Sequence, residues 1–181
     1  MTDALLLLVA QLLTGWLIAD LAGGFVHWIE DRILTEATPW LGQHVVAPNR
    51  RHHAEPLAFA AGGVLDRNAT TWACALGASL IWLLLAGPSV IWAAASLGGA
   101  VSSSVHLFAH LPKRGPRWVR VLQEVGLLQS PVHHAGHHRP PSDRRYCVLT
   151  DWSNPVLDAL GLWALLEGAL RAAGVPIAAD Q

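Results

Sequence analysis

Three long apolar runs dominate the hydropathy pattern and predict membrane-spanning helices. The first extends from Ala4 to about Trp28, and at 1.5 Å per residue it can cross about 30 Å of hydrocarbon. A cleaved signal peptide fits it less well, because nothing basic precedes the run and an apolar signal core has about 7–15 residues.

The second and third runs, Thr71–Ala86 and Val90–Leu111, are separated by Gly87-Pro88-Ser89, a break typical of a turn between helices. We expect a transmembrane hairpin, tilted or shallow because its first arm has only about 16 residues.

The basic residues predict which way these helices cross. All 12 Lys and Arg residues lie between Ile29 and Thr70 or after the third run. The residues before the first run and the turn of the hairpin carry none. Because cytoplasmic loops are enriched in Lys and Arg, three spans place the N-terminus outside and both basic segments in the cytoplasm.

Two later segments are predicted to be amphipathic helices in the lipid headgroup region. Trp118–Gln129 interleaves apolar residues with charged and amide side chains, and Val156–Gly174 carries three charged residues, a pattern typical of interfacial helices. A fourth span in Val156–Gly174 stays open, since about 19 residues are long enough to cross a bilayer. We therefore expect an all-α integral membrane protein of about three transmembrane helices, with residues 1–181 forming a single membrane-embedded domain.

Composition narrows the class of protein further. Hydrophobic residues make up 52% of the chain and charged residues 14%, against roughly 25% charged in a soluble domain, so a soluble or disordered protein is disfavoured. The net charge of −1 lacks the basic footprint of a nucleic-acid-binding protein. Two cysteines, Cys74 in an apolar run and Cys147 far from it, exclude a disulfide-rich scaffold.

The chain has ten histidines, and they gather where the predicted spans meet the cytoplasm. The candidate metal-ligating residues are His27, His52, His53, His106, His110, His133, His134, His137 and His138. Imidazoles three or four residues apart on a helix share one face and can bind one metal ion together. A zinc site takes only three or four ligands, so nine imidazoles indicate two metal ions. Imidazole suits Zn, Cu, Fe and Ni alike.

Three further polar residues have a less specific pattern. His44 stands alone and is predicted to be a surface or hydrogen-bonded histidine, not a ligand. Asp31 lies one helical turn from His27 on the same face. Asp20 lies deep in the first run, where an ionisable group is costly and is functional or paired.

In order and spacing, these residues resemble the motifs of one known family. The motifs are Asp20 with Gly24, His27-Trp28-x-x-Asp31, Arg51-His52-His53, His106-x-x-x-His110, Pro116-Arg117-Trp118 with Leu122-Gln123, His133-His134-x-x-His137-His138, Tyr146-Cys147 and Trp152-x-Asn154. Together they resemble the Kua/CarF lipid desaturase family, which includes plasmanylethanolamine desaturase-like membrane di-iron enzymes. The resemblance runs from about Asp20 to Glu167, while the stretch Ala54–Thr71 departs from the family pattern.

The resemblance implies a membrane-bound, non-haem di-iron enzyme with two Fe per chain. Such an enzyme uses O2 and electrons from a separate donor, a ferredoxin or a cytochrome b5-like protein. It introduces a double bond into an alkyl or acyl chain of a phospholipid, and vinyl-ether formation in plasmalogens is one form of this reaction. The resemblance also implies that the nine histidines are metal ligands and that Asp31 is the catalytic carboxylate beside them.

Three arginines are expected to bind the substrate. Arg50, Arg51 and Arg139 lie next to histidine motifs, and a guanidinium matches a lipid phosphate bidentately. No Gly-x-Gly-x-x-Gly motif follows a predicted strand, so a nicotinamide or flavin site is not expected and electrons must come from a partner protein.

Two other functions stay open at this point. A di-iron lipid hydroxylase needs the same ligands and differs only in adding oxygen to carbon. A metal transporter or metal-binding membrane protein is the other, but a transporter would spread its ligands through the depth of the membrane, whereas these histidines gather at one face. Eleven Arg against one Lys, with abundant Ala and Gly, favour a GC-rich bacterial genome and hence the bacterial inner membrane.

Overall fold

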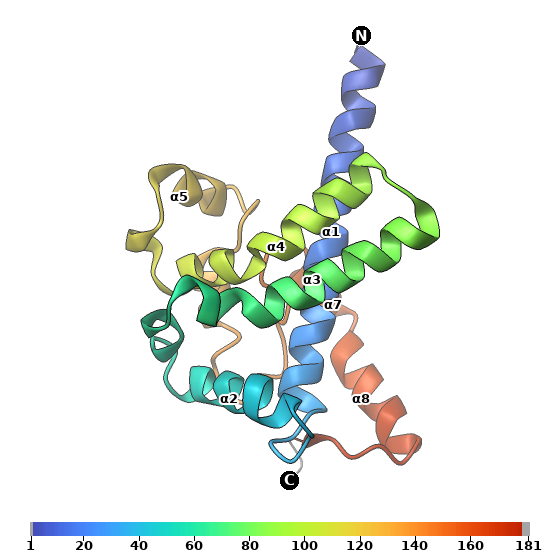
Figure 1. The fold of residues 1–181 in the computed structure, drawn as a ribbon. Coiled ribbons are helices and arrows are strands. Elements are labelled where there is room, and N and C mark those ends of the chain that lie inside the picture. The colour runs from blue at the N-terminus through green and yellow to red at the C-terminus, as the bar shows by residue number, and fades with distance from the viewer. Residues whose placement is uncertain (1, 179–181) are drawn as a thin grey trace.

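The computed structural model describes residues 2–178, and every regular element among them is helical (Figure 1). The helices are α1 (Thr2–Arg32), α2 (Ala47–Ala54), α3 (Val64–Ala86), α4 (Val90–His110), α5 (Arg117–Glu124), α6 (Pro131–Ala135), α7 (Ser153–Ala159) and α8 (Leu162–Ala172), with short π or 3-10 segments η1 (Gly42–Val46), η2 (Ala58–Ala61) and η3 (Pro112–Arg114). Three of them, α1, α3 and α4, are long and apolar enough to cross a membrane. This confirms the predicted all-α fold with three candidate spans, while the sidedness stays a prediction.

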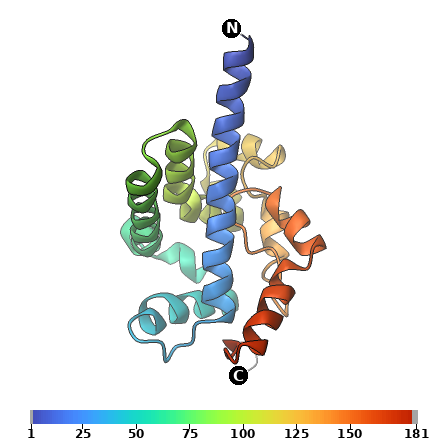
Figure 2. The same cartoon turned by 90° about the vertical axis from the view of Figure 1, so that its right-hand side faces the viewer.

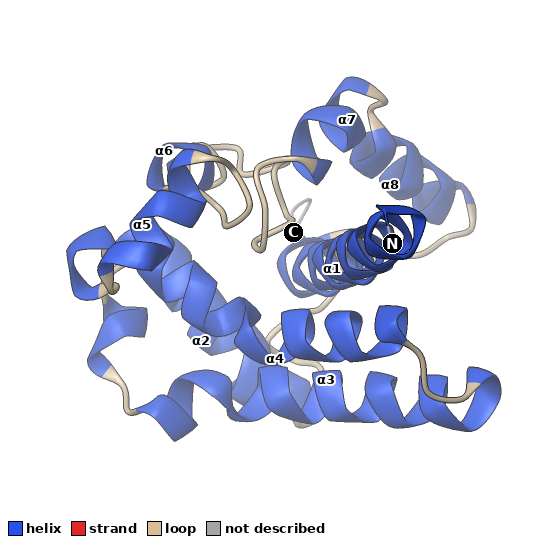
Figure 3. Cartoon of the chain, turned by 90° about the horizontal axis from the view of Figure 1, so that it is seen from above, coloured by secondary structure: helices blue, strands red, loops and turns tan. Residues whose placement is uncertain are grey.

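Helix α1 is the axis around which the other helices are arranged. Its 31 residues give it a length of about 46 Å. Its first turns extend beyond the rest of the molecule (Figure 2) and expose leucines such as Leu6, as expected of a helix surrounded by hydrocarbon. Beside the remainder of α1, the α3–α4 hairpin lies on one side and α7 and α8 on the other (Figure 2 and Figure 3).

Small residues allow α1 and α4 to cross closely. A Cβ atom on Gly98 of α4 would lie 2.7 Å from the Cβ of Ala19 on α1, and a Cβ on Gly15 would lie 2.3 Å from the carbonyl oxygen of Ile91. Contacts of this kind hold helices together in a bilayer, where van der Waals packing replaces the hydrophobic driving force. The crossing brings the C-terminal turns of both helices, which carry His27 and His106, to the same end of the molecule.

The first arm of the hairpin begins earlier than predicted. Helix α3 starts at Val64, not Thr71, because Asp66 caps it by accepting the N–H of Gly63 at 2.9 Å. The polar residues between Asp66 and Thr71 form its first turns. At 23 residues the helix is about 35 Å long, so the predicted length of about 16 residues is wrong, while the tilt or shallow position of the hairpin stays a prediction.

The C-terminal third departs most from the predicted elements. Helix α5 ends at Glu124 instead of Gln129, because Gly126 adopts a left-handed conformation with φ of 73°. Residues 156–174 are not one helix, since Gly161, with φ of 62°, separates α7 from α8. The 11 residues of α8 extend about 16 Å, which is too short for a fourth span. The location of these helices in the headgroup region stays a prediction.

Asp20 joins α1 to the segment that returns beside it after α6. Its carboxylate is buried and accepts the backbone N–H of Leu149 at 2.8 Å and of Thr150 at 3.2 Å. It also accepts the hydroxyls of Thr150 at 2.6 Å and Ser153 at 2.7 Å. Four donors therefore satisfy this buried group, and of the two roles open to Asp20 the structure shows the paired one.

Replacing Asp20 with Ala is expected to destabilise the protein by about 3–5 kcal/mol, because four buried donors lose their charged acceptor. The measurement is the thermal unfolding midpoint of the detergent-solubilised protein. Asp3→Ala, at an exposed position on the same helix, is the control and should leave the midpoint unchanged. Equal midpoints for the two variants would contradict this role of Asp20.

Candidate metal centre

Four segments bring nine candidate ligands together at one end of the helices. They come from the last turns of α1 and α4, from α2, and from α6 with the turn that follows it. The residues are His27, Asp31, His52, His53, His106, His110, His134, His137 and His138. In space they form two groups, each with ligand atoms within 4.8 Å of one another.

Group A consists of His52, His106, His110, His134 and His138. The Nε2 atom of His110 lies 2.8 Å from that of His134, 3.1 Å from that of His106 and 3.2 Å from that of His52. The Nε2 atom of His138 lies 3.1 Å from that of His134. Two nitrogens bound to one ion at about 2.1 Å and at right angles lie about 3.0 Å apart. The spacing of these nitrogens therefore fits ligands of a shared metal ion.

Group B consists of three histidines around one carboxylate, Asp31. The Nε2 atom of His53 lies 3.2 Å from Oδ1 of Asp31. The Nε2 atoms of His137 and His27 lie 3.2 Å and 3.6 Å from its Oδ2. Asp31 Oδ2 and the Nε2 atoms of His53 and His137 are buried without a well-formed hydrogen bond among the described residues. Buried polar atoms left in this way need an explanation, and a bound metal ion would provide one.

Backbone carbonyls hold two imidazoles of group B in the orientation that a metal requires. The Nδ1–H of His27 donates to the carbonyl of Tyr146 at 2.9 Å, and the Nδ1–H of His137 donates to the carbonyl of Arg144 at 2.7 Å. With the proton on Nδ1, the lone pair of Nε2 is directed toward Asp31. The side-chain amide of Asn49 donates to Asp31 as well.

The two groups are neighbours. The ring centroids of His53 and His138 are 4.9 Å apart, those of His52 and His53 5.9 Å, and those of His27 and His106 6.3 Å. Each of these pairs joins one group to the other. The arrangement thus fits two ions in adjacent sites, each with its own set of side-chain ligands.

Burial keeps the imidazoles of group A neutral. Burial and, to a lesser extent, the neighbouring histidines together lower the pKa of His52 to about 2 and that of His138 to about 3. The same causes hold the pKa of His134 well below its usual range. Neutral imidazole is the form that binds metals, so protons compete little for these nitrogens at neutral pH.

His133 and His44 lie outside both groups. The Nε2 atom of His133 is 3.1 Å from the side-chain nitrogen of Asn154, and its Nδ1 is 4.0 Å from Asp151. His133 therefore faces a different side of α6 from His134, although the sequence motif contains both. His44 is exposed beside Trp40, with ring centroids 4.9 Å apart, as predicted for a surface histidine.

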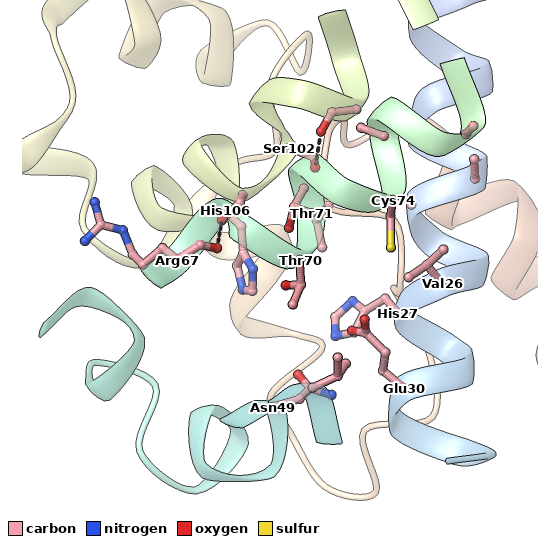
Figure 4. A pocket seen from close by; sticks show the side chains of 18 of the residues that line it. Val26, His27, Glu30, Asn49, Arg67, Thr70, Thr71, Cys74, Ser102 and His106 are labelled. Atoms are coloured by element: carbon pink, nitrogen blue, oxygen red, sulfur yellow. Dashed lines mark hydrogen bonds between the residues drawn. The ribbon is translucent and has the colours of Figure 1, made fainter. Parts of the chain in front are cut away.

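A cavity of about 820 Å³ opens on both groups and extends between α1, α3 and α4 (Figure 4). His27 of group B and His106 of group A project into one end of it. Small residues line its middle, namely Ala22, Gly23, Ala75, Ala78, Ala95 and Gly99. Trp82 and Trp92, near the hairpin turn, line the opposite end. The volume is within the range of ligand pockets in proteins.

The three predicted substrate-binding arginines occupy different positions. Arg51 lines the cavity and forms an ion pair of 3.8 Å with Glu55. Arg50 is 3.4 Å from Glu36 and lines a separate crevice beside Asp31 and His53. Arg139 is exposed and lines neither space.

Several residues of the site were not found from the sequence. Asn49 and His53 both contact Asp31. They stand four residues apart on α2, and this spacing was a signal that they share one face of the helix. Glu30 and Arg67 line the cavity near the histidines (Figure 4), but nothing in their sequence surroundings distinguishes them. The carbonyls of Tyr146 and Arg144 act through the backbone and leave no side-chain signal.

Comparison with known proteins decides the family. A family model described as the lipid desaturase domain matches residues 16–176. The chain belongs to the lipid desaturase domain family. The resemblance found in the sequence motifs is thereby confirmed.

Curated relatives are similar to this lipid desaturase domain over most of its length. It is 32% identical to plasmanylethanolamine desaturase of Myxococcus xanthus over 168 residues, which cover 89% of this chain and 59% of the relative. It is 27% identical to plasmanylethanolamine desaturase 1 of Mus musculus over 180 residues, 91% of this chain and 65% of the relative. It is 31% identical to the chloroplastic fatty acid desaturase 4-like 2 of Arabidopsis thaliana over 163 residues, 86% of this chain and 57% of the relative. The chain thus spans roughly three fifths of the length of these three relatives, and no solved structure matches it.

Two adjacent histidines of this lipid desaturase domain are expected to differ in their effect on metal content. His134→Ala removes a ligand atom from the centre of group A and should lower the metal bound per chain by about half or more, because losing one of few ligands weakens a site strongly. His133→Ala leaves both groups intact and should retain the metal. Elemental analysis of the purified variants measures both, and equal metal loss in the two would contradict the grouping.

The lowered pKa values predict how the stability of the metal-free protein depends on pH. In the unfolded chain, His52, His134 and His138 regain a pKa near 6.5, whereas in the folded protein the pKa is about 2 for His52 and about 3 for His138. Below pH 6.5 the unfolded state therefore binds more protons, and the free energy of unfolding falls as the pH falls.

Unfolding midpoints of metal-free protein between about pH 7.5 and pH 5 test this expectation. His44→Ala, which removes an exposed histidine, should leave the pH dependence as it is. Stability that is constant or rises over this interval would contradict the burial of neutral imidazoles.

Proposed function

We propose that this chain is a membrane lipid desaturase, which removes two hydrogen atoms from a lipid chain held in the cavity. The observation that carries the proposal is the continuity of a largely apolar cavity with two adjacent groups of metal-ligand side chains. Membership of the lipid desaturase domain family supports it. The proposed substrate is an alkyl or acyl chain of a phospholipid, with vinyl-ether formation as one form, because the relatives are named as plasmanylethanolamine and fatty acid desaturases.

Iron is the metal we propose, with one ion in each group and two Fe per chain. Zinc has no redox chemistry, whereas imidazole and carboxylate ligands also suit iron. When bound, the iron would supply the O2 activation and the breaking of unactivated C–H bonds that amino-acid side chains do not perform. Asp31 is the proposed carboxylate of the centre, in a catalytic role as a metal ligand.

The chain itself holds the reactants in place. The helices hold neutral imidazole nitrogens toward two common points, and the small residues of the cavity leave room for a lipid chain beside His27 and His106. A fixed distance between the reacting carbons and the centre, in a space from which water is excluded, is what the protein contributes to a cofactor-borne reaction.

The reaction balances only with an external electron donor. Converting –CH2–CH2– to –CH=CH– with one O2 consumes two electrons and two protons and releases two water molecules. We propose a ferredoxin or a cytochrome b5-like protein as the donor. It would dock on the face that carries the histidine groups, which the distribution of basic residues predicts to be cytoplasmic, at the inner membrane of a bacterium.

The lipid headgroup is proposed to lie at the histidine end of the cavity. Among the described residues, the charged ones that line the cavity are Glu30, Arg51, Asp66 and Arg67. Glu30 and Arg67 lie at the end with His27 and His106 (Figure 4), and Arg51 and Asp66 are the sequence neighbours of His52 and Arg67. The ion pair of Arg51 with Glu55 is largely exposed and therefore weak, so a lipid phosphate can replace Glu55. Arg50 and Arg139 are proposed as further contacts for the headgroup.

The test compares the lipids of a host that produces this chain with those of a host that produces His134→Ala. Wild type should yield a lipid species lighter by two hydrogen atoms, and the purified protein should contain about two irons per chain. The His134→Ala variant should insert into the membrane but yield no such species.

Other products would point to other functions. A species heavier by one oxygen atom would identify a hydroxylase with the same ligands. An unchanged lipid profile, with zinc or no metal in the protein, would overturn the proposal and favour metal transport or binding. Residues 1–181 are proposed to act here as a single membrane-embedded domain.

A further inference from the structure

Two tryptophans line the far end of the cavity, and hydrogen bonds hold one of them, Trp92, in place. The indole N–H of Trp92 on α4 lies 3.1 Å from the carbonyl oxygen and 3.0 Å from the hydroxyl of Ser79 on α3. The hydroxyl of Ser79 is also 2.8 Å from that of Ser96. Trp82, the second tryptophan at this end, stands one helical turn beyond Ser79. The network fixes the position of the Trp92 ring between the two helices.

One face of α4 forms the floor of the cavity from this wall to the metal centre. The lining residues on α4 recur three or four positions apart, as Trp92, Ala95, Ser96, Gly99, Ser102, Ser103 and His106. All residues between Trp92 and His106 on this face are small. The floor is therefore open between its two ends, and its length along the helix is about 21 Å.

That length corresponds to a common lipid chain. An extended hydrocarbon advances about 1.3 Å per carbon, given C–C bonds of about 1.5 Å and tetrahedral angles. The floor between His106 and Trp92 thus holds about sixteen carbons. Since the charged lining residues lie at the histidine end, a lipid would enter with its headgroup there and its terminal methyl toward the tryptophans.

We propose that Trp92, with Trp82 beside it, determines the length of the lipid chain that this protein accepts. A chain whose tail meets the indole wall places the carbons near its headgroup at the metal centre. A longer chain cannot be seated without displacing them. This inference rests on the proposed function for the reaction, but the binding of a chain of limited length does not depend on catalysis.

Two pairs of variants test the proposal, one that widens the cavity and one that shortens it. Trp92→Ala removes the wall, and Trp72→Ala is its control. Trp72 also joins α3 to α4, because its indole N–H donates to the Ala100 carbonyl at 2.9 Å. It does not line the cavity. Ala78→Leu fills the cavity one turn before Trp82, and Ala73→Leu makes the same change at an exposed position of α3 outside the cavity.

The iron-loaded proteins are reconstituted, with O2 and a reduced ferredoxin or cytochrome b5 as electron donor, into vesicles of diacyl and alkyl-acyl phosphatidylethanolamine with an equimolar series of chain lengths. Mass spectrometry then measures the chain lengths of the product and of the lipid that remains bound after solubilisation. Trp92→Ala should shift both distributions toward longer chains by about four carbons, the length of an indole. Ala78→Leu should shift them toward shorter chains by about four carbons, which is one helical turn.

The outcomes separate the inference from the proposed function. Unchanged distributions in both cavity variants, or equal shifts in the control variants, overturn the role of the tryptophan wall. A shift in bound lipid without desaturated product from any protein, wild type included, supports the wall and overturns the proposed reaction. Shifts in both bound lipid and product support the two together.

Discussion

The convergence of buried imidazoles is the constraint on which the rest of this structure depends. Nitrogen atoms of group A lie as close as 2.8 Å to one another, and their rings are held neutral by burial. A neutral imidazole has one N–H and one lone pair, so N–H···N hydrogen bonds among the five rings use only part of these lone pairs, whereas a cation between them would bind one from each ring. The scaffold brings the rings together by drawing the ligands from helices that are fastened elsewhere.

Helix α1 carries most of that fastening. Its Asp20 accepts four hydrogen bonds from the segment after α6. One turn further on, a side chain at Gly24 would lie 2.5 Å from the Cys147 sulfur, so only glycine allows this segment to approach. The approach places the Tyr146 carbonyl within 2.9 Å of His27. Three positions on one face of α1 thus connect the stability of the fold to the orientation of a ligand in group B.

Local periodicity accounts for the spans and ligand pairs that were predicted from the sequence. It does not encode the grouping of the ligands or the start of α3, which were missed. Hydropathy located three spans, and four-residue spacing correctly placed Asp31 beside His27 and His110 beside His106. The division of the ligands into two groups depends on how four distant segments meet, which periodicity does not encode. His133 and His134 are adjacent in one motif, yet only His134 faces group A from the five-residue helix, while His133 faces Asn154. The early start of α3 followed from capping by Asp66, a polar signal that a search for apolar runs overlooks.

The register of α4 links packing to the proposed chemistry. One face of α4 is buried and meets α1 at Gly98; it includes Ala94, Gly98 and Val105. The next face around the helix lines the cavity, with Ala95, Gly99, Ser102 and His106. Successive residues on a helix are rotated by about 100°. Small residues on one face of α4 therefore allow close packing, and small residues on the next face leave the space of the cavity. A rotation of α4 by one residue would turn His106 toward α1 and out of the cavity. The contact that holds these two helices together therefore also keeps a metal ligand and a lipid-sized space in line with each other.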